Sequence, residues 1–186
     1  MAKFFDELNE KLTKFVAAQK IFFVATAATD GRINLSPKGY DALKILGPNR
    51  ILWLNLSGSG NETAAHLKVS NRITLMFCAF EDPPLIMRIY GTAQAVHPRD
   101  AQWETLISHF DDLPGSRQIF DMKIESVQTS CGWGVPYFDF AGERSKLVDN
   151  FKAKDTEAIE DGWAKNNAVS IDGLETGIIV ADEPSE

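Results

Sequence analysis

Apolar side chains near the start of the chain recur at the spacing of a helix that packs on one side. Phe4, Leu8, Leu12 and Phe15 follow one another every three or four residues among Lys and Glu neighbours. A helix completes a turn in about 3.6 residues, so these four side chains share one face. The pattern predicts an amphipathic N-terminal helix whose role is packing.

The chain then changes to β-branched and aromatic segments separated by turn residues, which is typical of antiparallel strands. Thr29-Asp30-Gly31 has the composition of a hairpin turn, and Asp82-Pro83-Pro84 joins the two longest segments. Six strands are expected, over Ile21–Ala27, Gly31–Ser36, Arg50–Leu56, Arg72–Phe80, Leu85–Val96 and a last segment in which Phe120, Met122 and Ile124 alternate.

Helical spacing returns at two places between these strands. Glu62–Ser70 repeats apolar residues at helical intervals, and Pro98 opens a helix with Trp103, Leu106, Ile107 and Phe110 on one face. Strands in hairpins with few inserted helices predict an α+β fold built on an antiparallel barrel or curled sheet. A doubly wound parallel sheet needs a helix between nearly every pair of strands, and the chain does not supply them.

The length of 186 residues fits one domain with a short extension. A hydrophobic content of 44% supplies a sizeable core and excludes a disordered chain. Residues 1–140 are expected to form the barrel domain. Residues 141–186 are more polar and are expected to pack on it as a C-terminal extension, with a loose acidic end at Ala181–Glu186.

The net charge of −7 changes the range of partners. Nucleic acids and anionic membrane surfaces repel such a chain, so we expect neither as a partner. The longest apolar run, Ile21–Ala28, is far shorter than the roughly 20 residues that cross a bilayer. Charged residues interrupt the N-terminus, so no secretion signal is expected, and Cys78 and Cys131 are expected to be free thiols. The cytoplasm is the expected compartment.

A loop rich in Gly and hydroxyl residues leads into the helix that begins near Glu62. It runs from Ser57 to Thr63 and includes Ser59 and Asn61. Backbone N–H groups at the positive end of a helix dipole are suited to receive a phosphate. The same residues have a purely structural interpretation, because Ser59 and Glu62 have the spacing of a capping box.

A second polar segment precedes this loop. In Gly31–Gly39, the residues Arg32, Asn34 and Ser36 alternate on one face of an expected strand, and Lys38 follows Pro37. A basic residue at each end of one strand face is suited to clamp a dianion. A solvated strand face is the alternative, and the two segments together favour a phosphate site.

Other templates for chemistry find little support. His66, His97 and His109 stand apart without ligand-spaced partners, so no metal site is expected. Cys131 has no nearby cysteine or evident base, which gives no indication of a redox or nucleophilic role.

With these segments in place, the chain resembles the pyridoxamine 5′-phosphate oxidase-like family of FMN-binding split-barrel proteins. The resemblance extends from about Phe15 to Arg144 and depends on the order and spacing of several short motifs. They are Phe22-Phe-Val-Ala-Thr-Ala, Asp30-Gly-Arg-Ile-Asn-Leu-Ser-Pro-Lys-Gly39, Leu52-Trp-Leu-Asn, Gly60-Asn-Glu-Thr, Asn71-Arg-Ile-Thr-Leu-Met-Phe, Met87-Arg-Ile-Tyr-Gly-Thr-Ala and Ser130-Cys-Gly-Trp-Gly-Val-Pro136.

The resemblance implies a six-stranded antiparallel split barrel that forms a homodimer, with FMN in two clefts between the subunits. It implies that the phosphate lies against the strand of Arg32 and the Ser57–Thr63 loop, and that Arg88 lies near the flavin ring. A guanidinium there stabilises negative charge on the reduced flavin. The full set of expected cofactor-binding residues is Arg32, Ser36, Lys38, Ser57, Ser59, Asn61, Thr63, Arg88, Trp133, Phe140 and Arg144.

Two departures from the family pattern bear on activity. Members that oxidise pyridoxamine phosphate have a basic pair at the helix start, where this chain has Glu62-Thr63. They also have a C-terminal Arg-x-His segment, and the matching stretch from Arg144 to Asp149 contains no histidine. Pyridoxamine phosphate oxidation is therefore not expected.

The sequence thus leaves three hypotheses of function, the last of which is an interaction module whose cleft has lost its ligand. The first is an FMN-dependent oxidoreductase that acts on a small organic molecule, in which the protein positions the flavin and tunes its potential. The second is a non-catalytic protein that binds FMN, haem or another tetrapyrrole-like ligand on the same scaffold. No catalytic residue is assigned in any of these cases.

Overall fold

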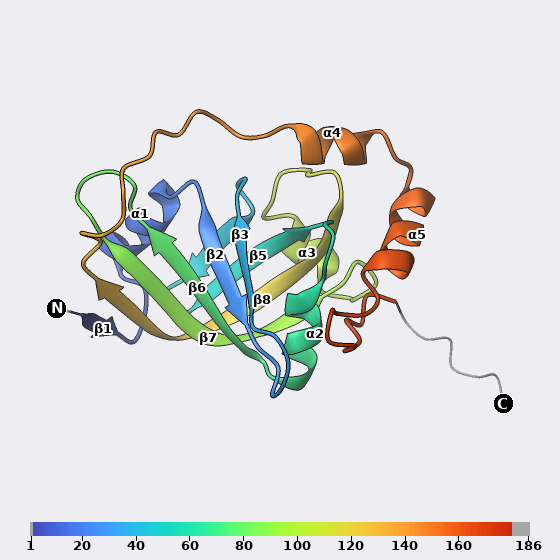
Figure 1. The fold of residues 1–186 in the computed structure, drawn as a ribbon, viewed down its shortest axis with the longest axis horizontal. Helices are drawn as coiled ribbons and strands as arrows, with labels where there is room; N and C mark the ends of the chain where they lie inside the picture. The colour runs from blue at the N-terminus through green and yellow to red at the C-terminus, as the bar shows by residue number, and fades with distance from the viewer. Residues whose placement is uncertain (1, 180–186) are drawn as a thin grey trace.

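The computed structural model describes residues 2–179, and these residues form one curled antiparallel sheet with short helices at its edges (Figure 1). The hydrogen-bonded path runs β3-β2-β6-β7-β8-β5-β4, and β1 pairs with β8. The strands are β1 (Lys3–Phe5), β2 (Phe22–Thr26), β3 (Asn34–Lys38), β4 (Leu43–Gly47), β5 (Arg50–Leu56), β6 (Arg72–Cys78), β7 (Ile86–Val96) and β8 (Ser116–Ser130). The α+β class and the split barrel are confirmed, with eight described strands instead of six.

The strands close around an apolar core because their buried positions alternate. Every second position is buried along β2 and along β7 from Ile86 to Ala93, which is the period of a strand with one face inward. Four aromatic rings meet in the centre. Phe22 stacks on Phe77 at 5.8 Å and meets the edge of Trp53 at 6.2 Å, while Trp53 lies 4.6 Å from Phe120 between ring centroids. Such pairs add to the free energy gained by burial.

The N-terminus differs from the expectation of one helix that includes Phe4. Residues Lys3–Phe5 form β1 and pair with residues 127–129 of β8, which leaves Phe4 67% exposed. The helix α1 runs from Glu10 to Ala18. It begins only at Glu10 because the Asn9 side chain caps it there by accepting a hydrogen bond from the Leu12 N–H at 3.0 Å. Leu12 and Val16 carry its buried face.

The strand expected over Gly31–Ser36 is also displaced along the chain. β3 begins at Asn34, so Arg32 precedes it, and the half-buried face consists of Asn34, Ser36 and Lys38. The displacement follows from the register, because Phe22 pairs with Lys38 and Thr26 with Asn34. β3 and β4 lie at the two ends of the hydrogen-bonded path, which is where the described barrel is split.

Short helices flank the sheet. The helix expected at Glu62–Ser70 is α2 (Glu62–Val69), while the one expected from Pro98 is α3 and covers only Trp103–Ile107. The C-terminal extension crosses the barrel to α4 (Lys146–Lys152) and α5 (Thr156–Asn166), and then reaches α2 (Figure 1). The acidic end at Ala181–Glu186 lies outside the described residues. Within residues 2–179, no helix has the length and apolar character needed to cross a bilayer.

Candidate functional site

The expected site residues gather mainly at two places. The Ser57–Thr63 loop, the start of α2 and Arg32 form one of them. The other is a groove beside Lys38, at the opposite end of β3. The half-buried face of β3 runs between the two places, with Asn34 toward the loop, Ser36 in the middle and Lys38 at the groove.

Hydrogen bonds within the chain already engage most polar side chains of the Ser57–Thr63 loop. The Ser57 hydroxyl donates to the Gly115 carbonyl at 2.8 Å and accepts from Trp163 Nε1 of α5 at 2.7 Å. Asn61 exchanges amide hydrogen bonds with the buried Gln118, and the Thr63 hydroxyl accepts from Asn34 at 3.1 Å. Ser59 is exposed. The loop is therefore a fixed element, held from both the barrel and the extension.

Two carboxylates lie at the start of α2, where the sequence predicts a phosphate. The Asp172 carboxylate accepts from the Arg32 backbone N–H at 2.7 Å and pairs with the Arg32 guanidinium. Both carboxylate oxygens of Glu62 accept from the Ile171 N–H at 3.2 Å. The capping box is wrong, because the N-cap of α2 is Asn61 and the Glu62 carboxylate accepts from the Ile171 N–H instead of from Ser59.

A buried arginine lies behind the loop, and no sequence pattern singles it out. Arg117 of β8 is only 2% exposed, and its Nη2 donates to the Gly60 carbonyl at 3.0 Å. Its Nε and Nη1 have no hydrogen-bond partner among the described residues. Burial lowers the pKa of Arg117 to about 10. The alternation that predicts the last strand begins at Phe120, and nothing in it extends the strand back to Arg117.

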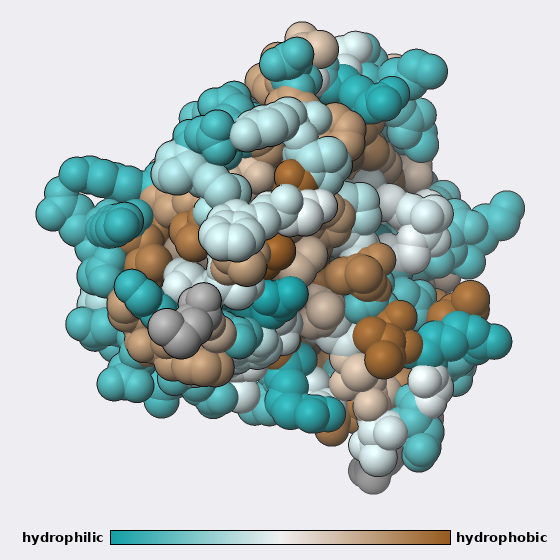
Figure 2. All heavy atoms as spheres, turned by 60° about the vertical axis from the view of Figure 1, so that its left-hand side comes forward, coloured by the Kyte–Doolittle hydropathy of each residue, from teal (hydrophilic) through white to brown (hydrophobic). Residues whose placement is uncertain are grey.

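The groove has a volume of about 1120 Å³. It lies between α1, the end of β3, the β6–β7 connection and residues 138–144 of the extension. Figure 2 turns this end of the molecule toward the viewer and shows apolar patches among polar ones. The apolar lining includes Phe15, Ile21, Tyr40, Phe80, Leu85, Phe138 and Phe140. A groove of this size and lining is typical of a small-molecule site.

Lys38 is the half-buried cation of the groove. Its ammonium lies 5.3 Å from the centroid of the Trp53 ring, and no ion pair with a carboxylate is recorded for it among the described residues. Burial, and then repulsion by Arg117, lower the pKa of Lys38 from 10.5 to about 8. Lys38 is therefore still mainly charged at pH 7, and an anionic or electron-rich ligand would compensate its lost hydration.

The extension and the β3–β4 turn build the opposite wall of the groove. The Tyr40 hydroxyl donates to the Arg144 carbonyl at 2.6 Å, and the Tyr40 backbone has a φ of +58°, which non-glycine residues seldom adopt. Lys20 lies 5.8 Å from the centroid of the Phe140 ring. Of the expected cofactor-binding residues, the groove thus brings together Lys38, Phe140 and Arg144.

Two expected residues belong to neither place. Arg88 is half-buried on β7, and its nearest recorded partner is the Ser130 hydroxyl at 3.5 Å. Trp133 is 84% exposed in the turn after β8. These positions do not test whether Arg88 and Trp133 contact a flavin, so their assignment as cofactor-binding residues stays a prediction.

The histidines and cysteines are dispersed. His66 Nδ1 lies 3.1 Å from the Thr26 hydroxyl under α2, His97 is buried at the end of β7, and His109 is exposed. Burial is the main cause that lowers the pKa of His97 to about 4. Within residues 2–179, no cluster of three or more His, Cys, Asp or Glu side chains is arranged to hold a metal ion. Cys78 and Cys131 are both free.

Known proteins share both the sequence pattern and the fold. The Pyridoxamine 5′-phosphate oxidase family protein ustO of Aspergillus flavus is 35% identical over 144 residues, which cover 75% of this chain. The matched region covers 58% of that protein's length.

Solved structures resemble the barrel at low sequence identity. A putative pyridoxamine 5′-phosphate oxidase from Lactobacillus delbrueckii has a TM-score of 0.53 at 17% identity, over 66% of this chain and 94% of that one. HupZ from Group A Streptococcus has a TM-score of 0.51 at 15% identity, over 64% of this chain and 91% of that one. These two likenesses support the fold.

The family model of pyridoxamine 5′-phosphate oxidase matches residues 8–131, which run from α1 to the end of β8 and leave out only β1 of the sheet. The resemblance found in the short motifs is thereby confirmed. The chain belongs to the pyridoxamine 5′-phosphate oxidase family.

Proposed function

We propose that the protein is a flavin-dependent oxidoreductase that binds FMN, with the flavin ring in the groove beside Lys38, and acts on a small organic substrate. The observation that carries the proposal is the groove itself. It combines aromatic walls with one half-buried ammonium that has no recorded carboxylate partner among the described residues. A flat aromatic ligand with an electron-rich edge suits both features.

The two ends of the site fit FMN to different degrees. The groove suits the ring system, since Phe140 and Phe80 supply apolar surface and Lys38 supplies a positive charge. The phosphate end does not fit as it stands, because Asp172 already pairs with Arg32 and Glu62 adds a second carboxylate. A bound flavin supplies hydride and electron transfer, and the chain's own residues bind and orient it.

A non-catalytic carrier of FMN or of a tetrapyrrole is the second candidate, because the groove volume of about 1120 Å³ lies above the range of about 300–1,000 Å³ of ordinary ligand pockets. Haem iron is held in proteins by His, Cys, Met or Tyr. Among the described residues that line the groove, only Tyr40 belongs to these types, and its hydroxyl donates to the Arg144 carbonyl. The lining therefore favours a flavin over a ligated haem.

The proposal includes a homodimer with no nucleic acid or membrane partner. Large apolar side chains are exposed near the edge strand β3, where Ile33 is 76% and Leu35 is 64% exposed. Exposed large apolar side chains beside an edge strand suit a subunit contact. In such a dimer, Arg88 and Trp133 are the residues that we propose to reach the flavin across subunits.

The visible spectrum of the full chain, purified with and without added FMN, tests the proposal. We expect a bound flavin spectrum, and bleaching of its visible band when a nicotinamide nucleotide is added without oxygen. Bound flavin that no nicotinamide nucleotide or other small organic reductant can bleach would favour the carrier. A haem spectrum, or no bound chromophore at any FMN concentration, would contradict the proposal.

A further inference from the structure

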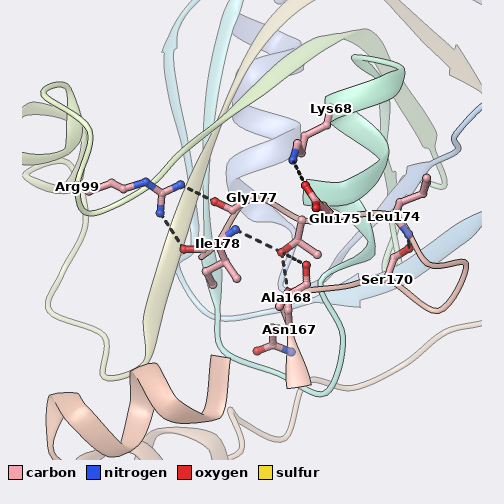
Figure 3. Close-up of polar contacts among 10 residues, drawn as sticks. Lys68, Arg99, Asn167, Ala168, Ser170, Leu174, Glu175, Gly177 and Ile178 are labelled. Carbon is pink, nitrogen blue, oxygen red and sulfur yellow. Dashed lines mark hydrogen bonds and ion pairs between the residues drawn. The ribbon is translucent and has the colours of Figure 1, made fainter. Parts of the chain in front are cut away.

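The last described segment of the chain forms a tight loop, Asn167–Ile178, that lies against α2 (Figure 3). Within this C-terminal loop, Val169 and Glu175 form an isolated antiparallel β-bridge. The Ser170 hydroxyl accepts from the Leu174 N–H at 3.1 Å. The Thr176 hydroxyl donates to the Asn167 carbonyl at 2.6 Å. These short-range bonds give the loop a fixed shape.

Contacts from the barrel fix the position of the C-terminal loop. Arg99 donates to the carbonyls of Gly177 and Ile178, and Lys68 of α2 pairs with Glu175 at 3.5 Å (Figure 3). At the other side of the loop, the Asn167 amide donates to the Gly58 carbonyl at 3.1 Å. The C-terminal loop is thus anchored both to the Ser57–Thr63 loop and to the strand ends near Arg99.

The anchored loop holds Asp172 against Arg32. Asp172 accepts from both the backbone and the side chain of Arg32, and its own side chain is 13% exposed. Gly31 makes the approach possible, since a Cβ at that position would lie 2.6 Å from Asp172 Oδ2. The carboxylate therefore lies against Arg32, and Asp172 is next in the chain to Ile171, whose N–H donates to Glu62 at the start of α2.

A phosphate dianion that approached Arg32 would find the Arg32 backbone N–H and part of its guanidinium already engaged by the Asp172 carboxylate. It would either have to displace Asp172 or remain close to two like charges, those of Asp172 and Glu62. Nearby like charges repel the dianion and so disfavour its binding. A guanidinium that is already paired with a carboxylate also gains less interaction energy from a new anion. A flavin that lacks the phosphate would not meet this opposition.

We propose that Asp172 is a specificity-determining residue that fills the anion position beside Arg32 and so lowers the affinity of the protein for phosphate monoesters such as FMN relative to riboflavin. The inference rests on the proposed function for its flavin ligand. It differs from the sequence-based expectation that Arg32 is free to hold the phosphate.

The test compares the full-length wild type with Asp172→Asn and with Glu175→Gln as the matched control. Asparagine keeps an oxygen that can accept from the Arg32 N–H but removes the charge. Glu175 lies on the same loop, and its only described ion pair is the one with Lys68, in which the Glu175 side chain is 83% exposed. Exposed pairs contribute little to stability, and the Arg99 and Asn167 contacts still anchor the loop when this pair is lost. Dissociation constants are measured for FMN and riboflavin by flavin fluorescence, and for inorganic phosphate by the shift of the Arg32 amide resonance.

We expect Asp172→Asn to tighten the binding of FMN and of inorganic phosphate about tenfold and to leave the riboflavin affinity unchanged. We expect Glu175→Gln to change none of these three affinities. The inference would be overturned if wild type and Asp172→Asn had the same ratio of FMN to riboflavin dissociation constants and the same phosphate affinity. The proposed flavin binding would still stand in that case. If neither flavin binds any variant but phosphate tightens in Asp172→Asn, the proposed function fails and the inference about Asp172 holds. If neither flavin binds any variant and the phosphate affinity is the same in wild type and Asp172→Asn, the proposed function and the inference about Asp172 both fail.

Discussion

At the scale of one residue, Lys38, which we propose to contact the ligand, lowers the stability of the fold. The pKa of its ammonium is lowered from 10.5 to about 8, chiefly by burial. The gap between the two values corresponds to roughly 3 kcal/mol of free energy that disfavours the charge in the folded state. Below pH 8 the group is protonated in both the folded and the unfolded chain, so this cost is present in full.

Replacement of Lys38 by Met should therefore stabilise the free protein. We expect the free energy of unfolding at pH 7 to rise by about 1–3 kcal/mol, because Met keeps the apolar stem and loses only the charge and its contact with the Trp53 ring. Between pH 8 and 10.5, the unfolded wild type binds a proton that the folded state has released, so wild-type stability should rise with pH. The variant should lack this rise.

Denaturant unfolding across this pH range measures both effects. Lys123→Met is the matched control, since Lys123 is exposed on β8. A variant Lys38→Met that is less stable than wild type at pH 7 would show that the ammonium is not desolvated as described.

At the scale of elements, the pairing of β7 with β8 depends on one glycine. The register of the two strands shifts between Tyr90 and Gly91, and a Cβ at Gly91 would lie 2.0 Å from the Lys123 carbonyl oxygen. That atom belongs to the backbone of β8, so it cannot move aside without disturbing the central pair of strands.

Gly91→Ala should accordingly destabilise the fold by about 3 kcal/mol or more, as overpacking against backbone does. Gly134→Ala is the control, because nothing lies within 4 Å of a Cβ built there. Thermal unfolding of the two variants compares them directly. Equal melting temperatures for Gly91→Ala and wild type would mean that the strands do not approach as closely as described.

Local periodicity predicts those elements that have a clear one-sided face. β2, β5, β6 and β7 lie within a few residues of their expected bounds, since alternation and turn residues mark them in the sequence. No pattern predicts β1 or β4. β1 is three residues long and exists because residues 127–129 pair with it, so its cause lies far away in the chain.

The candidate site is harder to predict for the same reason. The residue types at Lys38, Phe140 and Arg144 point to a binding site, and the structure places them around one groove. The partners of Arg32 and Ser57 are Asp172 and Trp163, more than a hundred positions away, and no local pattern signals such pairs. Arg117 is missed because the alternation that predicts the last strand begins only at Phe120, whereas β8 begins at Ser116.

At the scale of the whole molecule, we predict a homodimer whose assembly is linked to flavin binding. A cleft built from two chains binds flavin only in the dimer, so flavin in excess shifts the equilibrium toward the dimer by mass action. At a free flavin concentration of about one hundred times the dissociation constant, the dimer is favoured by roughly 2.7 kcal/mol per site. Light scattering over a dilution series, with and without FMN, measures it. A monomer that binds FMN stoichiometrically at every concentration would refute the shared cleft.

The central claim is that the groove beside Lys38 binds a flavin, and a fluorescence titration of FMN at pH 7 against wild type, Lys38→Met and Lys123→Met tests it most directly. A charge-assisted contact is worth about 1.5–3 kcal/mol. We therefore predict saturable binding to the wild type, affinity at least about tenfold weaker for Lys38→Met, and unchanged affinity for Lys123→Met. Absence of saturable binding, or equal affinity of wild type and Lys38→Met, would contradict the account.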